Sequence, residues 1–333
     1  MNYLSLLSQT QAYRTFIKER DEGTLSHAYL IVSPDADMNR TYVKHFAKAL
    51  FCEQQSVCNA CRACELIESE RYGDCTIYPA EKEGEKTQKI VTADIDDLVA
   101  QSYLKPVEGS RRAFVLAGAE NLTEQAQNKL LKTLEEPPQG VVILMIATSE
   151  YAMLSTVRSR VKKLELPYFT PEQITEALKE EVEDEDRLRL AAVSAGGMIG
   201  KALKLARDNA FLDMVGLSLQ ILTNMQKSSD VLSFSALVMK YKASSLTAFI
   251  DVLEIVARDA LMFKSGHKNM IMNKSRVIEI AKAGFTFAPA ALIGVIERCG
   301  EAKQSLKYNA NAQMVVDTLL FGILEGKYQW RKS

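Results

Sequence analysis

Four cysteines in one short stretch offer the clearest metal chemistry of this sequence. Cys52, Cys58, Cys61 and Cys64 follow the spacing C-x5-C-x2-C-x2-C. In a reducing compartment, cysteines this close together more often bind a metal than form disulfides. Four thiolates can surround Zn²⁺ as a closed tetrahedron, which leaves no open position and therefore makes a structural site. We predict structural Zn²⁺ here; the alternative is four untied thiols on a loop and a helix.

The other cysteines and the histidines suggest no catalytic nucleophile. Cys75 and Cys299 are isolated in the sequence, and we expect both to be small buried apolar groups. His27, His45 and His267 are scattered along the chain. No Ser/His/Asp or Cys/His arrangement can be argued from them, so the sequence gives no support for covalent catalysis.

A second pattern has the layout of a phosphate-binding loop without its chemistry. An apolar strand (28–32) runs into a turn and then into a helix (42–50). A working loop reads G-x-x-x-x-G-K-[ST], because glycines let backbone N–H groups approach the phosphates and the lysine neutralises them. Other residues stand at the places of the glycines, the lysine and the Mg²⁺-binding hydroxyl: Ser33, Ala36, Met38, Asn39 and Arg40.

Two further features argue against a working nucleotide site. Asp35 and Asp37 add negative charge where a triphosphate would lie. The apolar strand 113–116 is followed by Ala117 and Gly118, where an ATPase carries acidic residues that hold Mg²⁺ and polarise water. Two defects in the right order indicate a non-catalytic relative of an ATPase. The alternative is an ordinary strand, turn and helix that never bound nucleotide.

The wider pattern predicts the fold that positions these residues. Apolar strand-like runs alternate with helical stretches up to about residue 166, which indicates a parallel sheet covered by helices. The runs are 28–32, 113–116, 141–147 and 162–166, and the helices include 42–50 and 123–134. The charged stretch 81–89 predicts an exposed loop. From residue 167 onward the strand signals fade, and helices with methionine-rich apolar stripes follow.

Length and composition exclude several classes of protein. A chain of 333 residues is long enough for two or three domains. Its net charge of −1 argues against a chain that binds nucleic acid over its whole surface. No apolar run reaches the ~20 residues that span a membrane, and no targeting signal is visible at the N-terminus. We expect a cytoplasmic protein with no membrane partner.

Several segments together resemble the AAA+ clamp-loader subunits of bacterial DNA polymerase III. They are, in chain order, HAYL (27–30), FAKALFC (46–52), the cysteine run, NKLLKTLEEPP (128–138), Ala147-Thr148 and Ser159-Arg160. NKLLKTLEEPP and the cysteine run are specific, whereas the strands alone would be weak. The motor subunits, gamma or tau, carry an intact phosphate loop and acidic pair. The degenerate loop of this chain is similar to that of the delta-prime branch.

The resemblance implies an architecture and a set of partners. It implies an α/β AAA+ domain with a zinc-bearing insertion (1–166), a small helical lid (167–208) and an all-α collar (209–333). It also implies a five-membered ring with gamma/tau and delta subunits, which loads the sliding clamp on primer-template DNA. Within the DNA polymerase III holoenzyme, such a chain would be nucleoid-associated through the replisome.

The resemblance also implies a role for one arginine. Clamp-loader subunits supply an arginine from a Ser-Arg-Cys motif to the ATP site of a neighbour. Ser159 and Arg160 match this motif, and Val161 replaces the cysteine. A planar guanidinium is well suited to stabilise charge on a transferring phosphoryl group. Arg158 is the competitor for this role, and the alternative is that Arg160 only caps a surface turn.

A third signal of nucleotide binding is also missing. The lid of a motor subunit usually offers an arginine in a G-x-x-R-x-A-L pattern, and here Gly200 stands in its place. Lys201 is one residue out of register. We therefore expect no ATP bound in cis. The alternatives are an active gamma/tau-type ATPase and, less favoured, a zinc-ribbon nucleic-acid binder, since Arg62 is the one basic residue between the last three cysteines.

Overall fold

The chain divides into two compact units, which are described separately. The computed structural model describes residues 2–54, 56–80 and 89–329. The first unit contains residues 1–177 and 198–201, and the second contains residues 178–197 and 202–333. Apart from Lys89, the predicted loop 81–89 lies outside the described residues. The finer division into AAA+ domain, lid and collar stays a prediction.

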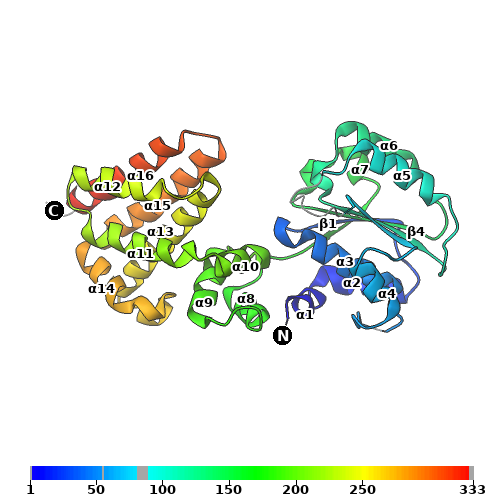
Figure 1. Ribbon diagram of the computed structural model, residues 1–333, viewed down its shortest axis with the longest axis horizontal. Helices are drawn as coiled ribbons and strands as arrows, with labels where there is room; N and C mark the ends of the chain where they lie inside the picture. Colours follow the sequence, from blue (N-terminus) through cyan, green and yellow to red (C-terminus); the bar gives the residue numbers. More distant parts are fainter. Residues whose placement is uncertain (1, 55, 81–88, 330–333) are drawn as a thin grey trace. The chain divides into compact units, whose positions relative to one another are not determined.

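A five-stranded parallel sheet forms the centre of the first unit, as the alternating pattern predicted (Figure 1). The strand order is β2-β3-β4-β1-β5. The strands are β1 (Ala28–Val32), β2 (Cys75–Tyr78), β3 (Arg112–Ala117), β4 (Val141–Ala147) and β5 (Lys162–Glu165). β4 is buried at every position, because it is central and helices cover both faces of the sheet. The short strand β2 was not predicted.

Helices cover the two faces of this sheet in separate groups (Figure 1). One face carries α1 (Tyr3–Ser8), α2 (Gln11–Asp21), α3 (Asn39–Phe51) and α4 (Arg62–Glu68). The other carries α5 (Thr92–Ser102), α6 (Glu124–Glu135) and the short α7 (Ser155–Arg158). The helix α8 (Pro171–Leu178) follows the last strand.

The helix α6 shows how local sequence sets these elements. Thr123 caps its start, and the side chain of Thr123 accepts a hydrogen bond from the backbone N–H of Ala126 (3.2 Å). Its apolar residues, spaced by four, include Ala126, Leu130 and Leu134, and all three are buried against the sheet. The helix ends before the two prolines at 137 and 138.

The second unit is entirely helical in its described residues. Its helices are α9 (Glu185–Ser194), α10 (Ile199–Arg207), α11 (Ala210–Asn224), α12 (Ser228–Val238), α13 (Ala243–Lys264), α14 (Val277–Thr286), α15 (Pro289–Lys307) and α16 (Ala312–Gln329). The first residues of α10 group with the first unit. Apolar stripes predicted along this half form its core; Val252 and Val256 of α13, for example, are fully buried.

Among the described residues, no single helix is both long and apolar enough to cross a bilayer. One pair, 274–286 with 289–307, reaches the required length and composition together but bends by 106° at its break.

The sheet topology brings the predicted loop and acidic positions to one edge. The carboxyl ends of β1, β3 and β4 lie at the same edge because the strands are parallel. β4 separates β1 from β3. The loop after β1 and the residues after β3 therefore flank the end of β4. In open α/β sheets, ligands bind at this edge.

Candidate functional site

The loop after β1 turns back on itself. The backbone N–H of Ser33 donates to the carbonyl of Ala147 (2.9 Å), which extends the ladder to β4 by one residue. The backbone N–H of Asp35 then donates to Ser33 Oγ (3.2 Å). A short 3-10 turn (Ala36–Met38) leads directly into α3. The predicted strand, turn and helix are all present, and α3 begins at Asn39.

Several side chains of this loop and of the start of α3 are buried. Met38, at a glycine place of a phosphate loop, is buried, and Ser33 is fully buried. Asn39, at the place of the lysine, is only 4% exposed. Its Oδ1 atom has no hydrogen-bond partner among the described residues. Because a buried asparagine stands at the place of the lysine, the start of α3 lacks the lysine cation that neutralises a triphosphate.

Arg40, at the place of the Mg²⁺-binding hydroxyl, is committed to a different contact. Its Nε and Nη2 atoms donate to the two carboxylate oxygens of Glu70 (2.9 and 2.6 Å). Its Nη1 atom donates to the carbonyl of Pro79 (3.0 Å), and Lys44 Nζ lies 2.8 Å from Glu70 Oε1. Burial raises the pKa of Glu70, but Arg40 and Lys44 outweigh this effect, and the pKa falls below its ordinary value. This network ties the start of α3 to Glu70 and to the carbonyl of Pro79.

The positions of the acidic pair carry no carboxylate. Ala117 ends β3, and Gly118 follows with a φ of +91°. The backbone N–H of Gly118 donates to the carbonyl of Ile146 (3.1 Å). The left-handed backbone of Gly118 favours glycine, so a bulky acidic residue could not adopt it without strain.

The start of α10 lies against this loop. Gly200, at the place of the lid arginine, is buried, and its backbone N–H donates to Asp35 Oδ2 (2.7 Å). Burial raises the pKa of Asp35, and the N–H groups of Gly200 and Ile199 oppose that rise. Asp35 of the loop and Gly200 at the place of the lid arginine, which were considered separately in the sequence, are therefore in direct contact.

Arg160 lies between α7 and β5, where its donors meet acceptors of its own chain. Its Nη1 atom donates to the carbonyl of Thr156 (2.8 Å) and to Ser159 Oγ (3.2 Å). Its Nη2 atom lies 2.8 Å from Glu135 Oε1, at the end of α6. The Arg160 side chain is 35% exposed, and Ser159 is exposed.

The competitor, Arg158, has different surroundings. Its guanidinium carbon lies over the ring of Tyr151, 5.3 Å from the ring centroid. Its Nε atom is buried and has no hydrogen-bond partner among the described residues. The guanidinium of Arg158 thus packs against a neighbouring ring, whereas the guanidinium of Arg160 makes polar contacts near the surface.

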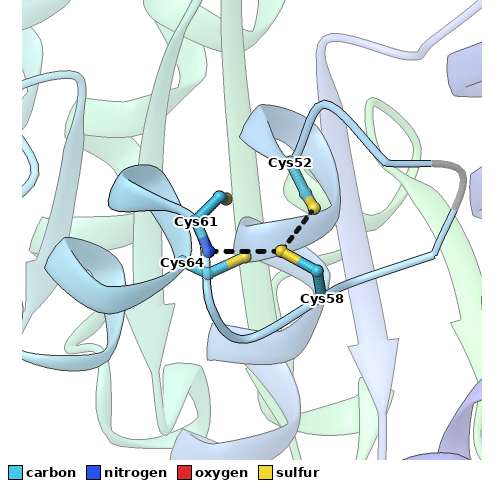
Figure 2. A group of neighbouring side chains, drawn as sticks. All are labelled: Cys52, Cys58, Cys61 and Cys64. Atoms are coloured by element: carbon cyan, nitrogen blue, oxygen red, sulfur yellow. Dashed lines mark hydrogen bonds between the residues drawn. The ribbon is translucent and has the colours of Figure 1, made fainter.

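The four predicted metal ligands come together (Figure 2). Cys52 follows directly after α3, Cys58 lies in the loop, Cys61 precedes α4 and Cys64 lies in its first turn. Their sulfur atoms all lie within 4.8 Å of one another, and Cys52 Sγ is 3.6 Å from Cys58 Sγ. Such a set of four can hold a metal ion, and four thiolates suit Zn²⁺.

The loop backbone favours a thiolate at one of these cysteines. The N–H groups of Ala60 and Cys61 lower the pKa of Cys58 to about 6, and the N–H of Cys61 lies 3.3 Å from its sulfur. Burial raises the pKa of Cys64. Backbone N–H groups directed at sulfur are typical outer contacts of a metal-bound thiolate.

Comparison with known proteins gives a consistent family. Residues 8–170 match the family described as "DNA polymerase III, delta subunit". The delta' subunit of Bacillus subtilis is 24% identical over 98% of this chain and 98% of its own length. The delta' subunit of Pseudomonas aeruginosa is 32% identical over 40% of this chain and 41% of its own length. The chain belongs to the clamp-loader family of DNA polymerase III subunits.

Subunits with other names also match this clamp-loader chain. The tau subunit of Escherichia coli is 29% identical over 55% of this chain and 29% of its own length. Among solved structures, a gamma subunit-related protein from Thermotoga maritima aligns with a TM-score of 0.44 at 19% identity. That alignment covers 96% of this chain and 100% of the other.

Two contacts of the candidate site residues escaped sequence analysis. Glu135 is the partner of Arg160, and Glu70 is the partner of Arg40. Glu135 lies inside the specific segment NKLLKTLEEPP, which was the one available signal. Nothing in the sequence singles out Glu70, because it follows a short helix and lies 30 residues from Arg40.

Proposed function

We propose that the chain is a non-catalytic clamp-loader subunit that supplies Arg160 in trans to the ATP site of a neighbour. It joins gamma/tau-type and delta-type subunits in a five-membered ring that loads the sliding clamp on primer-template DNA. The observation that carries the proposal is the state of the loop after β1. Asp35 and Arg40, which lie where phosphate and Mg²⁺ would bind, are used in contacts within the chain.

The surroundings of Arg160 support its role toward a neighbour. Its guanidinium is partly exposed and planar, and its ion pair with Glu135 is also partly exposed. Exposed ion pairs contribute only about 0–1 kcal/mol, so release from Glu135 costs little. An arginine that reaches a transferring phosphoryl group accelerates that step by roughly 10³–10⁵. The gain is therefore far larger than the cost of release.

The alternative is an active ATPase of the gamma/tau type, since subunits with those names also match. The purified full-length chain distinguishes the two. We expect neither Mg·ATP binding nor ATP hydrolysis by the chain alone. Hydrolysis by the lone chain, abolished by substitution within 33–41, would favour the active ATPase.

The role of Arg160 is tested inside the reconstituted assembly. We expect Arg160→Ala to lower DNA-stimulated ATP turnover and clamp loading, while the ring still assembles. Arg158→Ala is the matched control, because it removes a neighbouring guanidinium that packs on Tyr151. Turnover that falls with Arg158→Ala and not with Arg160→Ala would exchange the two roles. Unchanged turnover with both would remove the trans role altogether.

We also propose a metal, a domain division and a location for the chain. The four cysteines bind structural Zn²⁺, and no ATP is bound in cis. Residues 1–166, 167–208 and 209–333 act as AAA+ domain, lid and collar. The chain works in the cytoplasm, near the nucleoid, as part of the holoenzyme. These points rest on the cysteine geometry and on full-length similarity to a delta' subunit.

A further inference from the structure

A buried carboxylate joins the loop after β1 to the start of α10. Asp35 is 4% exposed, and its Oδ2 atom accepts the backbone N–H of Gly200 at 2.7 Å. The N–H groups of Ile199 and Asp37 also contact this carboxylate. The contact links residues that are 165 positions apart in the sequence. It lies within the first compact unit, which includes residues 198–201.

The space around Gly200 is matched to this contact. A Cβ atom added at Gly200 would lie 2.6 Å from Asp37 Cβ, 2.8 Å from Asp35 Oδ1 and 3.0 Å from Met38 Cγ. Distances this short require something to shift. Gly200 has no positive φ, so glycine is needed here for close approach rather than for backbone conformation. A side chain at this position would therefore force the loop, these side chains or the start of α10 to move.

The chemistry of the contact resembles that of a bound phosphate. The first N–H groups of a helix have no partner within the helix, and they attract anions. In a nucleotide-binding protein, phosphate oxygens commonly satisfy such groups. Here the carboxylate of Asp35 satisfies those of Ile199 and Gly200.

We infer that Asp35 is an internal substitute for a nucleotide phosphate, and that it fixes the first turn of α10 on the loop after β1 without any ligand. We call this contact between Asp35 and Gly200 the latch. Gly200 is its second half, because a glycine leaves room for the start of α10 to approach the loop. The latch explains why one chain carries an aspartate in the loop and a glycine at the arginine place. It rests on the contact itself and does not depend on the role of Arg160.

Hydrogen–deuterium exchange of the full-length chain tests the latch. We expect Asp35→Ala to speed amide exchange at residues 199 and 200 by about tenfold or more, because a buried hydrogen bond to a carboxylate is lost. Asp37→Ala is the matched control, since it removes a carboxylate from the same loop but keeps the Cβ atom next to Gly200. The control should leave exchange at these amides unchanged.

A second variant covers the case in which Asp35→Ala does not fold. Gly200→Ala keeps Asp35 and adds only the Cβ atom that has no room, so it should speed exchange at the same amides. Unchanged exchange at 199–200 in the folded variants would overturn the latch. So would protection of residues 33–41 by Mg·ATP in the unmodified chain. Neither result bears on Arg160, which is tested by turnover of the assembly.

Discussion

At the residue scale, the most informative side chain of the loop is that of Arg40. Arg40 stands where a phosphate loop carries a hydroxyl for Mg²⁺. Its guanidinium binds Glu70 through two parallel hydrogen bonds, and Lys44 adds a second cation to the same carboxylate. A bidentate pair of this kind is geometrically demanding. The start of α3 is therefore tied to Glu70, which lies just after α4.

Removing the charge of Glu70 should destabilise the protein in a pH-dependent way. We expect Glu70→Gln to lower the free energy of unfolding near pH 7 by about 1–3 kcal/mol, because Arg40 and Lys44 lose a partly buried partner. The pKa of Glu70 lies below its ordinary value of 4.5 in the folded protein. Its stabilisation is thus fully present above pH 4.5 and is lost as the pH falls through the lower, folded pKa.

Urea unfolding over a pH series checks this prediction. The difference between the unmodified chain and Glu70→Gln should shrink as the pH falls below 4.5. Glu185→Gln is a suitable control, because Glu185 and its partner Arg189 are both largely exposed. The control should change stability by less than about 1 kcal/mol. A loss for Glu70→Gln that is the same at every pH would mean that its charge is not the cause.

At the element scale, periodic patterns were readable from the sequence and distant contacts were not. The long apolar strands and the apolar face of α6 were predicted correctly, because burial imposes a regular spacing on them. The short strand β2 and the helix α5 were missed, since a few residues carry little periodic signal. The contact of Asp35 with Gly200 could not be predicted, because nothing local connects positions 165 residues apart.

The same contrast holds for the candidate sites. The cysteine cluster was predicted in full, because its ligands are close in sequence and their type dictates the chemistry. The absence of glycines and lysine from the loop was equally plain. What fills the loop instead is tertiary information, and so is the ion pair of Arg160 with Glu135. Sequence thus indicated what the loop lacks, and the structure gives the contacts that replace it.

The junction of α3 and α4 should depend on metal. Cys52 follows α3 directly, Cys61 precedes α4 and Cys64 lies in its first turn, so one ion would tie the two helices together. We expect one Zn²⁺ per chain and its loss in Cys61→Ser or Cys64→Ser. Structural zinc couples strongly to folding, so removal of the metal should lower the melting temperature.

Metal analysis combined with thermal unfolding measures this effect. The control is Ser56→Ala, which changes the cysteine loop but keeps all four ligands. Cys75→Ser would be a poor control, because Cys75 is buried in β2 and its replacement would itself affect stability. The control should retain its zinc. A metal-free preparation that melts at the same temperature as the zinc-loaded chain would rule out a structural role.

At the scale of the whole molecule, we propose that the chain keeps the frame of a nucleotide-driven subunit and uses it as fixed structure. The parallel sheet, the loop and the start of α10 are all present, and Asp35 and Arg40 of the loop make their contacts within the chain. Arg160 is the side chain that we propose acts on a neighbouring subunit, because its partly exposed ion pair with Glu135 costs little to break. A subunit of this design would change the chemistry of a neighbour without performing any of its own.

Single-turnover ATP hydrolysis by the reconstituted assembly tests this central claim most directly. With Arg160→Ala, the account predicts that the ATP bound at one site remains unhydrolysed during the rapid phase. The rate at that site should fall by roughly 10³–10⁵, while the other sites proceed normally. A rapid phase of unchanged amplitude and rate would contradict the account.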